Sequence, residues 1–145
     1  YFVHNFNLTR YLFGNIIDTK NISIGEEHGL LNLIHEKFEG TFEYTYLNNN
    51  DWIEKLEIYY EKSSIVLKIP PAFLKNITCQ VEIKNHQTGK IVKPIMPYSW
   101  SFKNQAEMFI ESLRKNKINI EFSGQDALID LKLIDDIWKK KIYDF

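Results

Sequence analysis

Residues 56–71 have the sequence LEIYYEKSSIVLKIPP, which predicts a β-hairpin. Its two halves alternate between apolar and polar side chains, and a period of two is typical of a strand with one buried face. The link Lys62-Ser63-Ser64 between the halves suits a short turn. Pro70 and Pro71 then end the hairpin, because proline has no backbone N–H to donate to a neighbouring strand.

The same alternation recurs on both sides of this hairpin and predicts a sheet. Further strands are expected near 16–24, 31–38, 41–46, 78–84 and 90–95. Turn-forming residues separate some of these strands, at Asn48-Asn49-Asn50-Asp51 and at His86-Gln87-Thr88-Gly89. Strands joined by short turns pair antiparallel, so the pattern predicts one open sheet of about six mostly antiparallel strands.

A short helix is predicted at the start of the chain. Leu8, Tyr11 and Leu12 are spaced to share one helical face. Gly14 follows them as a helix stop. His4 and Asn7 are three residues apart, so this helix would bring their side chains together.

Two helices are predicted at the end of the chain. The first covers 102–113, where apolar side chains recur at helical spacing: Phe102, Ala106, Phe109, Ile110 and Leu113. Ser123 and Asp126 form a capping-box pattern that opens the second. Its predicted buried face holds Ala127, Leu128, Leu131, Ile134, Ile137 and Trp138. The predicted fold class is therefore α+β, with helices packed on one face of the sheet.

The composition is that of an ordinary folded domain. The 145 residues are 44% hydrophobic and 26% charged, which suits a single core. The net charge is −1, which disfavours nucleic acid as a partner because phosphate binding needs a basic surplus. No apolar run has the length of a membrane span, so no membrane partner is expected. Cys79 is the only cysteine, and a cytoplasmic location is the simplest expectation.

The glycines and the first residue bear on domain organisation. The six glycines fit neither a G-x-G-x-x-G turn nor a phosphate-binding P-loop, so no nucleotide site is expected in this chain. The chain begins at Tyr1 rather than at methionine. We therefore expect residues 1–145 to be a single domain taken from a longer protein.

Few residues point to chemistry. The four histidines have no zinc-ligand spacing, so no metal site is expected. The acidic pairs Glu26-Glu27 and Asp135-Asp136 suit a solvated surface. The aromatic residues Tyr98, Trp100 and Phe102 suit either a pocket or, as the favoured alternative, core packing.

His4 is the strongest candidate for a functional side chain. It stands at the N-terminal end of the first predicted helix, beside the apolar residues Phe2, Val3 and Phe6. The positive end of the helix dipole favours a neutral imidazole, which can take up a proton. A purely structural histidine is the alternative.

Four segments of the chain resemble the Gfo/Idh/MocA oxidoreductases, and they occur in the same order. Residues 4–14 (HNFNLTRYLFG) resemble the family's H-x-x-D/N-L-x-R-Y-L-x-G segment, which joins the nucleotide domain to the second domain. The family's mid-sheet hairpin is similar to residues 52–59, 65–67 and 70–71. Its F-x-x-Q-A-x-x-F helix is similar to residues 102–113. Residues 123–128 (SGQDAL), with Leu131 and Ile134, resemble its closing S/P-G-x-D-A-L-x-x-L-x-L-I segment.

The resemblance implies that this chain is the C-terminal domain of such an enzyme, without its N-terminal Rossmann domain. The family's C-terminal domain is built on an open, mostly antiparallel sheet, like the C-terminal domain of glyceraldehyde-3-phosphate dehydrogenase. The implied function is substrate binding and oligomerisation in an NAD(P)-dependent oxidoreductase that transfers a hydride at a hydroxyl or keto carbon of a sugar-like substrate. The implied partners are that substrate, the chain's own Rossmann domain, and further copies that pair through the sheet face.

The resemblance also assigns two site residues. His4 corresponds to the histidine of the family's D-x-G-x-H motif, which acts as acid and base on the substrate hydroxyl. Asn7, one helical turn later, would bind substrate hydroxyls. NAD or NADP would be held by the Rossmann half, so this chain by itself is expected to bind no cofactor and to be inactive.

Two departures from the family's pattern leave a second hypothesis open. Phe2 stands where the D-x-G-x-H motif has glycine, and the motif's Asp would precede Tyr1. The alternative is a non-catalytic module of the same fold, which binds a sugar or a partner protein and assists assembly.

Overall fold

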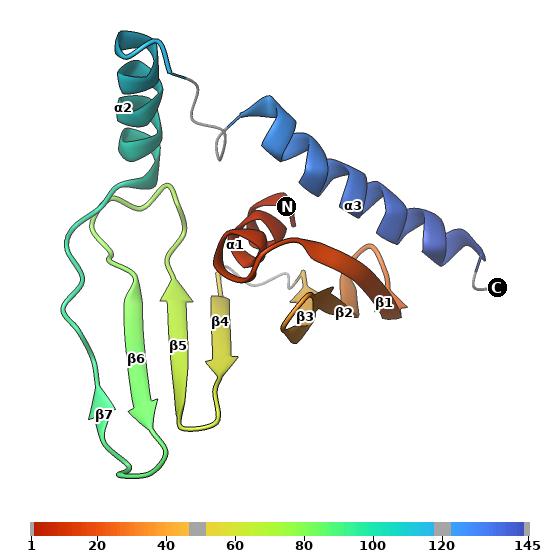
Figure 1. Ribbon diagram of the computed structural model, residues 1–145, viewed down its shortest axis with the longest axis horizontal. Coiled ribbons are helices and arrows are strands. Elements are labelled where there is room, and N and C mark those ends of the chain that lie inside the picture. Colours follow the sequence, from red (N-terminus) through yellow and green to blue (C-terminus); the bar gives the residue numbers. More distant parts are fainter. Residues whose placement is uncertain (1, 47–51, 118–122, 144–145) are drawn as a thin grey trace. The chain divides into compact units, whose positions relative to one another are not determined.

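The computed structural model describes residues 2–46, 52–117 and 123–143, with all side chains in these ranges except those of 21 and 141–143. Figure 1 shows the order of elements along the chain. They are α1 (Val3–Phe13), β1 (Ile16–Ile24), β2 (His28–His35), β3 (Glu39–Thr45), β4 (Glu54–Tyr59), β5 (Ser63–Ile69), β6 (Gln80–Asn85), β7 (Ile91–Val92), α2 (Ser101–Arg114) and α3 (Gly124–Tyr143). The turn predicted at Asn48-Asn49-Asn50-Asp51 lies outside the described residues.

The chain divides into two compact units. The first comprises 1–48 and 118–145, and the second comprises 49–117. All strand pairs are antiparallel, as predicted, so the α+β class is confirmed. The strands form two sheets, β1-β2-β3 and β4-β5-β6-β7, where the sequence predicted one sheet of about six strands. Alternation identifies single strands, but it does not specify which strands pair.

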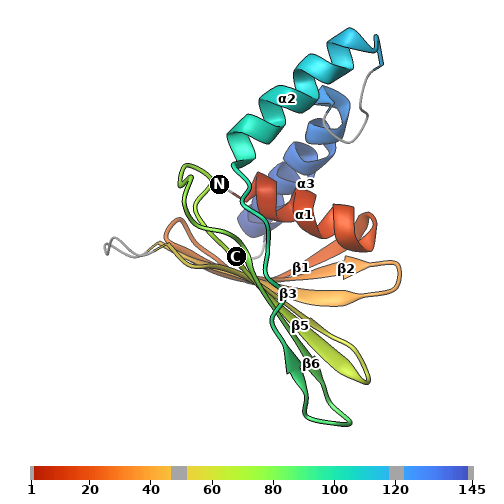
Figure 2. The same cartoon turned by 90° about the vertical axis from the view of Figure 1, so that its left-hand side faces the viewer.

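The first unit is a three-stranded sheet with two helices on one face. Strand β2 lies in the centre, and α1 and α3 lie on the same side of the sheet (Figure 2). Register shifts interrupt β1 between Ile16 and Asp18 and again further along the strand. Alternate side chains of β2 are buried beneath the helices, as the period of two requires.

The core of the first unit is small. Its buried apolar residues are Phe6, Leu31, Leu33 and Ile137. The buried face predicted for α3 was wrong in part, since Leu128 and Leu131 are exposed. In α1, Tyr11 and Leu12 are exposed as well. Phe6 is the buried residue of α1, and Ile137 is the fully buried apolar residue of α3. A helix can carry two apolar stripes, and packing decides which one is covered.

The predicted helix ends are confirmed. The backbone of Gly14 has a φ of 84°, a left-handed conformation that favours glycine, and its N–H donates to the carbonyl of Arg10 at 2.9 Å. At the start of α3, the backbone N–H of Asp126 donates to Oγ of Ser123 at 3.2 Å. This is the N-cap bond of the predicted capping box.

The second unit contains the hairpin of residues 56–71. Leu56 pairs with Leu67 and Ile58 with Ile65, so one face of this sheet is apolar. Strand β7 covers only Ile91–Val92, shorter than the predicted strand. Among the described residues, all the buried side chains belong to the first unit. The second unit therefore has a sheet with an apolar face but no fully buried core residue.

Helix α2 ends the second unit and packs little. It extends beyond the end of the four-stranded sheet (Figure 1), and all its residues except Ser112 are exposed. The helix was predicted correctly, but its apolar stripe of Phe102, Phe109, Ile110 and Leu113 is exposed. Lys115 and Glu111 pair at 2.5 Å, one helical turn apart.

Candidate functional site

Helix α1 carries both residues predicted for the site. His4 lies in its first turn and is exposed, and within the described part of the chain its imidazole makes no hydrogen bond or ion pair. Asn7 lies one turn later and is half-buried. Residues three apart on a helix are neighbours on its surface, so a ligand on this side of α1 can contact both side chains.

The amide of Asn7 contacts two carboxylates of α3. Its Nδ2 atom donates to Oδ2 of Asp126 and to Oδ2 of Asp130, both at 2.9 Å. A primary amide has two hydrogens, so both are used. The opposite assignment of the amide would place its oxygen against two carboxylate oxygens, so these contacts fix which atom is the nitrogen.

Arg10 binds the same two carboxylates. Its Nε donates to Oδ1 of Asp130 at 2.8 Å, and its Nη2 donates to Oδ1 of Asp126 at 2.8 Å. The Asp130 side chain is 1% exposed, that of Arg10 9% and that of Asp126 18%. The hydrogen bond to Asp130 raises the pKa of Arg10 above its usual value, although burial acts in the opposite direction. The guanidinium thus stays charged between two carboxylates.

We call Asn7, Arg10, Asp126 and Asp130 the polar cluster. Asn7 was predicted from the sequence as a site residue, whereas the other three were not identified as a group. A signal was present, because Asp126 and Asp130 are four residues apart and Asn7 and Arg10 are three apart. Charged residues are usually exposed, however, so the spacing alone did not indicate burial.

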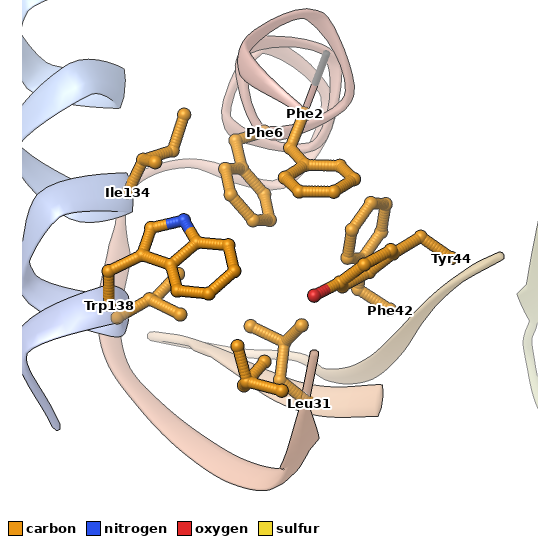
Figure 3. A pocket seen from close by; sticks show the side chains of 9 residues that line it. Phe2, Phe6, Leu31, Phe42, Tyr44, Ile134 and Trp138 are labelled. Carbon is orange, nitrogen blue, oxygen red and sulfur yellow. The ribbon is translucent and has the colours of Figure 1, made fainter. Parts of the chain in front are cut away.

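Phe2 takes part in the core instead of opening a site. Its ring lies 4.2 Å from that of Tyr44 and 5.6 Å from that of Phe42, measured between centroids. With Phe6, Leu31 and Trp138 these rings line a cavity of about 10 Å³ (Figure 3). Such a volume suits about one water molecule and excludes a sugar or a dinucleotide.

Tyr44, which lines this cavity, makes a part-buried hydrogen bond. Its hydroxyl donates to the carbonyl of Gly25 at 2.6 Å. Burial raises the pKa of this phenol above its usual value. Because Tyr44 lies in β3 and Gly25 lies between β1 and β2, this hydrogen bond is a structural contact that joins β3 to the β1–β2 turn.

The other candidates for chemistry do not form a site. His35 is buried, and its Nδ1 lies 2.8 Å from the carbonyl oxygen of Gly14, so this nitrogen donates. His86 lies 3.1 Å from Oγ of Ser64. No group of three or more metal-binding side chains comes together in the described ranges. Glu26, Glu27, Asp135 and Asp136 are exposed, as predicted.

The aromatic segment before α2 differs from its prediction. Tyr98 is 75% exposed and Phe102 is also exposed, so the favoured interpretation of core packing was wrong for these two. Trp100 is half-buried, with Nζ of Lys75 4.2 Å from the centre of its ring. This contact is a cation–π pair within the second unit.

Two further findings concern membrane spans and known proteins. No helix in the described residues is both long and apolar enough to cross a membrane. Comparison of the chain with protein-family models, with curated proteins and with solved structures finds no match.

Proposed function

We propose that this chain is the substrate-binding and assembly domain of a nicotinamide-dependent oxidoreductase that acts on a sugar-like polyol. The proposal begins from the four segments that resemble the Gfo/Idh/MocA enzymes. The observation that carries it furthest is the contact of Arg10 with Asp126 and Asp130. This contact joins the first and the last of the four segments. If these two segments resembled the family only by chance, no contact between them would be expected.

His4 is the proposed acid–base residue. It is exposed near the N-terminus of α1, and a ring nitrogen without a partner in the described residues is available to take up the proton of a substrate hydroxyl. Asn7 is the proposed substrate-binding residue beside it. The polar cluster holds this helix against α3.

The nicotinamide would supply the redox chemistry when bound. The cavity beneath α1, of about 10 Å³, is too small to hold it, and the six glycines match no phosphate-binding motif. A separate Rossmann domain in the full-length protein is therefore part of the proposal.

Assembly is the role proposed for the second unit. One face of its sheet gathers apolar side chains: Leu56, Ile58, Ile65, Leu67, Ile69, Val81, Ile83 and Val92. The opposite face is largely charged or polar, with Lys55, Glu57, Lys68, Glu82 and Lys84. An apolar sheet face is stabilised when it is shielded from water. A second copy of the chain can shield it by packing the same face against it, as in a twofold-symmetric dimer.

The deciding experiment uses the full-length protein. The coding sequence before Tyr1 is expected to encode a strand, a G-x-G-x-x-G turn, a helix and an E-K-P tripeptide. The purified protein is then assayed with NAD and NADP against sugars, inositols and nucleotide sugars. His4→Ala should lower turnover by about 10²-fold or more. His28→Ala is the matched control, because His28 is an exposed histidine of the same unit. An upstream sequence without a dinucleotide fold contradicts the proposal.

A non-catalytic module of the same fold is the second candidate. The packing of Phe2 against Phe42 and Tyr44 favours it, because this position then serves the core and not a site. A full-length protein that binds NADH but oxidises none of the assayed polyols, and whose binding is unchanged by His4→Ala, would establish it.

A further inference from the structure

Strand β4 is an edge of the four-stranded sheet. Within the described residues it pairs with β5 and with no other strand. At the end of this hairpin the backbone N–H of Tyr60 donates to the carbonyl of Ser63 at 2.8 Å, and hydrogen-bonded and non-hydrogen-bonded pairs alternate from there along the ladder. The backbone N–H and C=O groups of Lys55, Glu57 and Tyr59 therefore point away from β5. They form an edge to which another strand can be added.

The side chains along this edge alternate in character. Lys55 and Glu57 lie on the polar face of the sheet, where their side chains pair at 2.6 Å. These side chains are 45% and 33% exposed, so each can take a second partner of opposite charge. Leu56 lies between them in the chain, on the apolar face.

We propose that two copies of the chain pair edge to edge through β4, antiparallel, with Leu56 opposite the partner's Leu56. In this register Lys55 lies opposite the partner's Glu57, and Glu57 lies opposite the partner's Lys55. Each of these pairs exchanges two backbone hydrogen bonds, and opposite charges across a ladder are favourable. Ile53 and Tyr59, which are 84% and 70% exposed, also come opposite each other.

The side chains of β4 disfavour the neighbouring registers. A shift of one residue places the apolar face of one copy beside the polar face of the other. A centre at Lys55 sets two lysines opposite each other, and a centre at Glu57 sets two glutamates opposite each other. Like charges directly opposite are destabilising. The register centred on Leu56 is the one in which both charges are matched.

The inference rests on the assembly role proposed for the second unit and adds a second interface to it. The twofold axis of an edge-to-edge pair runs perpendicular to the sheet, so both apolar faces lie on the same side of one continuous sheet. Face-to-face packing of two such sheets gives a tetramer with two kinds of interface. A few backbone hydrogen bonds contribute little against the entropy of association. The edge contact therefore forms within the assembly that the apolar face holds together.

Light scattering of the full-length protein at micromolar concentration tests the charges. The wild type is expected to be a tetramer. Lys55→Glu sets glutamates opposite each other and should lower the measured mass twofold, to that of the face-to-face dimer. Combining Lys55→Glu with Glu57→Lys restores opposite charges in the same register and should restore the tetramer. Lys84→Glu is the control and should leave the mass unchanged, because Lys84 is an exposed lysine of the same face but belongs to β6.

A cysteine at position 56 tests the register. The pair at this position is a non-hydrogen-bonded one, with Cα atoms about 4.5 Å apart, which a disulfide can bridge. Leu56→Cys in a Cys79→Ser background should therefore give a disulfide-linked dimer on oxidation. Ile58→Cys in the same background is the control. The two copies of position 58 are separated by four residues along the strand, about 13 Å, which is beyond the reach of a disulfide.

The outcomes separate this inference from the proposed function. A tetramer that Lys55→Glu leaves intact, a wild type that is only a dimer, or an oligomer without a crosslink at position 56 overturns the edge pairing and leaves the proposed function standing. A wild-type protein that is monomeric at micromolar concentration overturns both the edge pairing and the proposed assembly.

Discussion

The side chains of Arg10 and Asp130 are bound through Nε and Oδ1 at 2.8 Å, although the residues are 120 positions apart in the sequence. The contact joins α1 to α3 in the first unit. The Asp130 side chain is 1% exposed, and its carboxylate is bound by Arg10 and by Asn7. A buried ion of this kind is costly without its partner.

Loss of Arg10 should therefore destabilise the first unit strongly. Arg10→Met leaves two carboxylates without a cation and should cost about 3 kcal/mol or more of unfolding free energy. Combining it with Asp130→Leu should recover most of that loss. Urea titration followed by Trp138 fluorescence, in a Trp52→Phe, Trp100→Phe background, measures this unit because the other two tryptophans are in the second. Lys139→Met, which removes an exposed pair with Asp135, is the control and should have an effect near zero.

The core prediction concerns two leucines of the first unit. Leu31 is 1% exposed, and Leu31→Ala should lower the unfolding free energy by about 2–5 kcal/mol, because it removes a buried side chain and leaves a cavity. Leu128 is 47% exposed, so Leu128→Ala should change it by less than about 0.5 kcal/mol. Equal effects in the same urea titration would contradict the observed face of α3.

Gly29 lies beneath the ring of Tyr44. A Cβ at position 29 would overlap the Tyr44 ring, whereas a Cβ at Gly40 would meet no atom within 4 Å. Gly29→Ala should therefore cost about 1–3 kcal/mol of stability, as overpacking does. Gly40→Ala is the matched control on the neighbouring strand and should be within about 0.5 kcal/mol of wild type. Thermal melts and urea titrations of the two variants test this difference.

The ion pair of Asp18 with Lys140 predicts a pH dependence. The hydrogen bond from Lys140, at 3.1 Å, lowers the pKa of Asp18 below its ordinary value of 3.8. A lowered pKa stabilises the folded state above pH 3.8, and this contribution is lost as the pH falls through the pKa of the folded protein. The melting temperature of Asp18→Asn should thus lie below that of wild type at pH 6 and converge with it near pH 2. Asp136→Asn, at an exposed position of α3, should show no such convergence.

The proposed assembly predicts opposite outcomes on the two faces of β5. Leu67 belongs to the apolar face, so Leu67→Lys should shift the protein from an oligomer to a monomer in light scattering. Val66 lies on the other face, opposite Glu57 and Glu82, where a lysine has favourable partners. Val66→Lys should leave the oligomer intact. A wild-type protein that is monomeric at micromolar concentration contradicts the proposed role of this face.

Much of the local structure could be predicted from the sequence. The period of two identified the strands of the 56–71 hairpin, because each side chain in a strand alternates between faces whatever the strand packs against. Gly14 and Ser123 marked helix ends correctly, because a left-handed backbone and a capping hydroxyl are local requirements. His4 and Asn7 were correctly predicted to lie on one helix, because helical spacing is also a local property of the sequence.

The remaining features depended on packing between distant segments. The side of α3 that faces α1 contains Asp126 and Asp130. The prediction of a buried face used apolar residues alone, so it selected Leu128 and Leu131 instead. The burial of the two carboxylates follows from Arg10, whose charge makes a carboxylate tolerable away from water. The sequence by itself determined the elements and their ends, since these follow from neighbouring residues. Only the tertiary structure decided which faces are covered and which strands pair, because each depends on a partner far away in the chain.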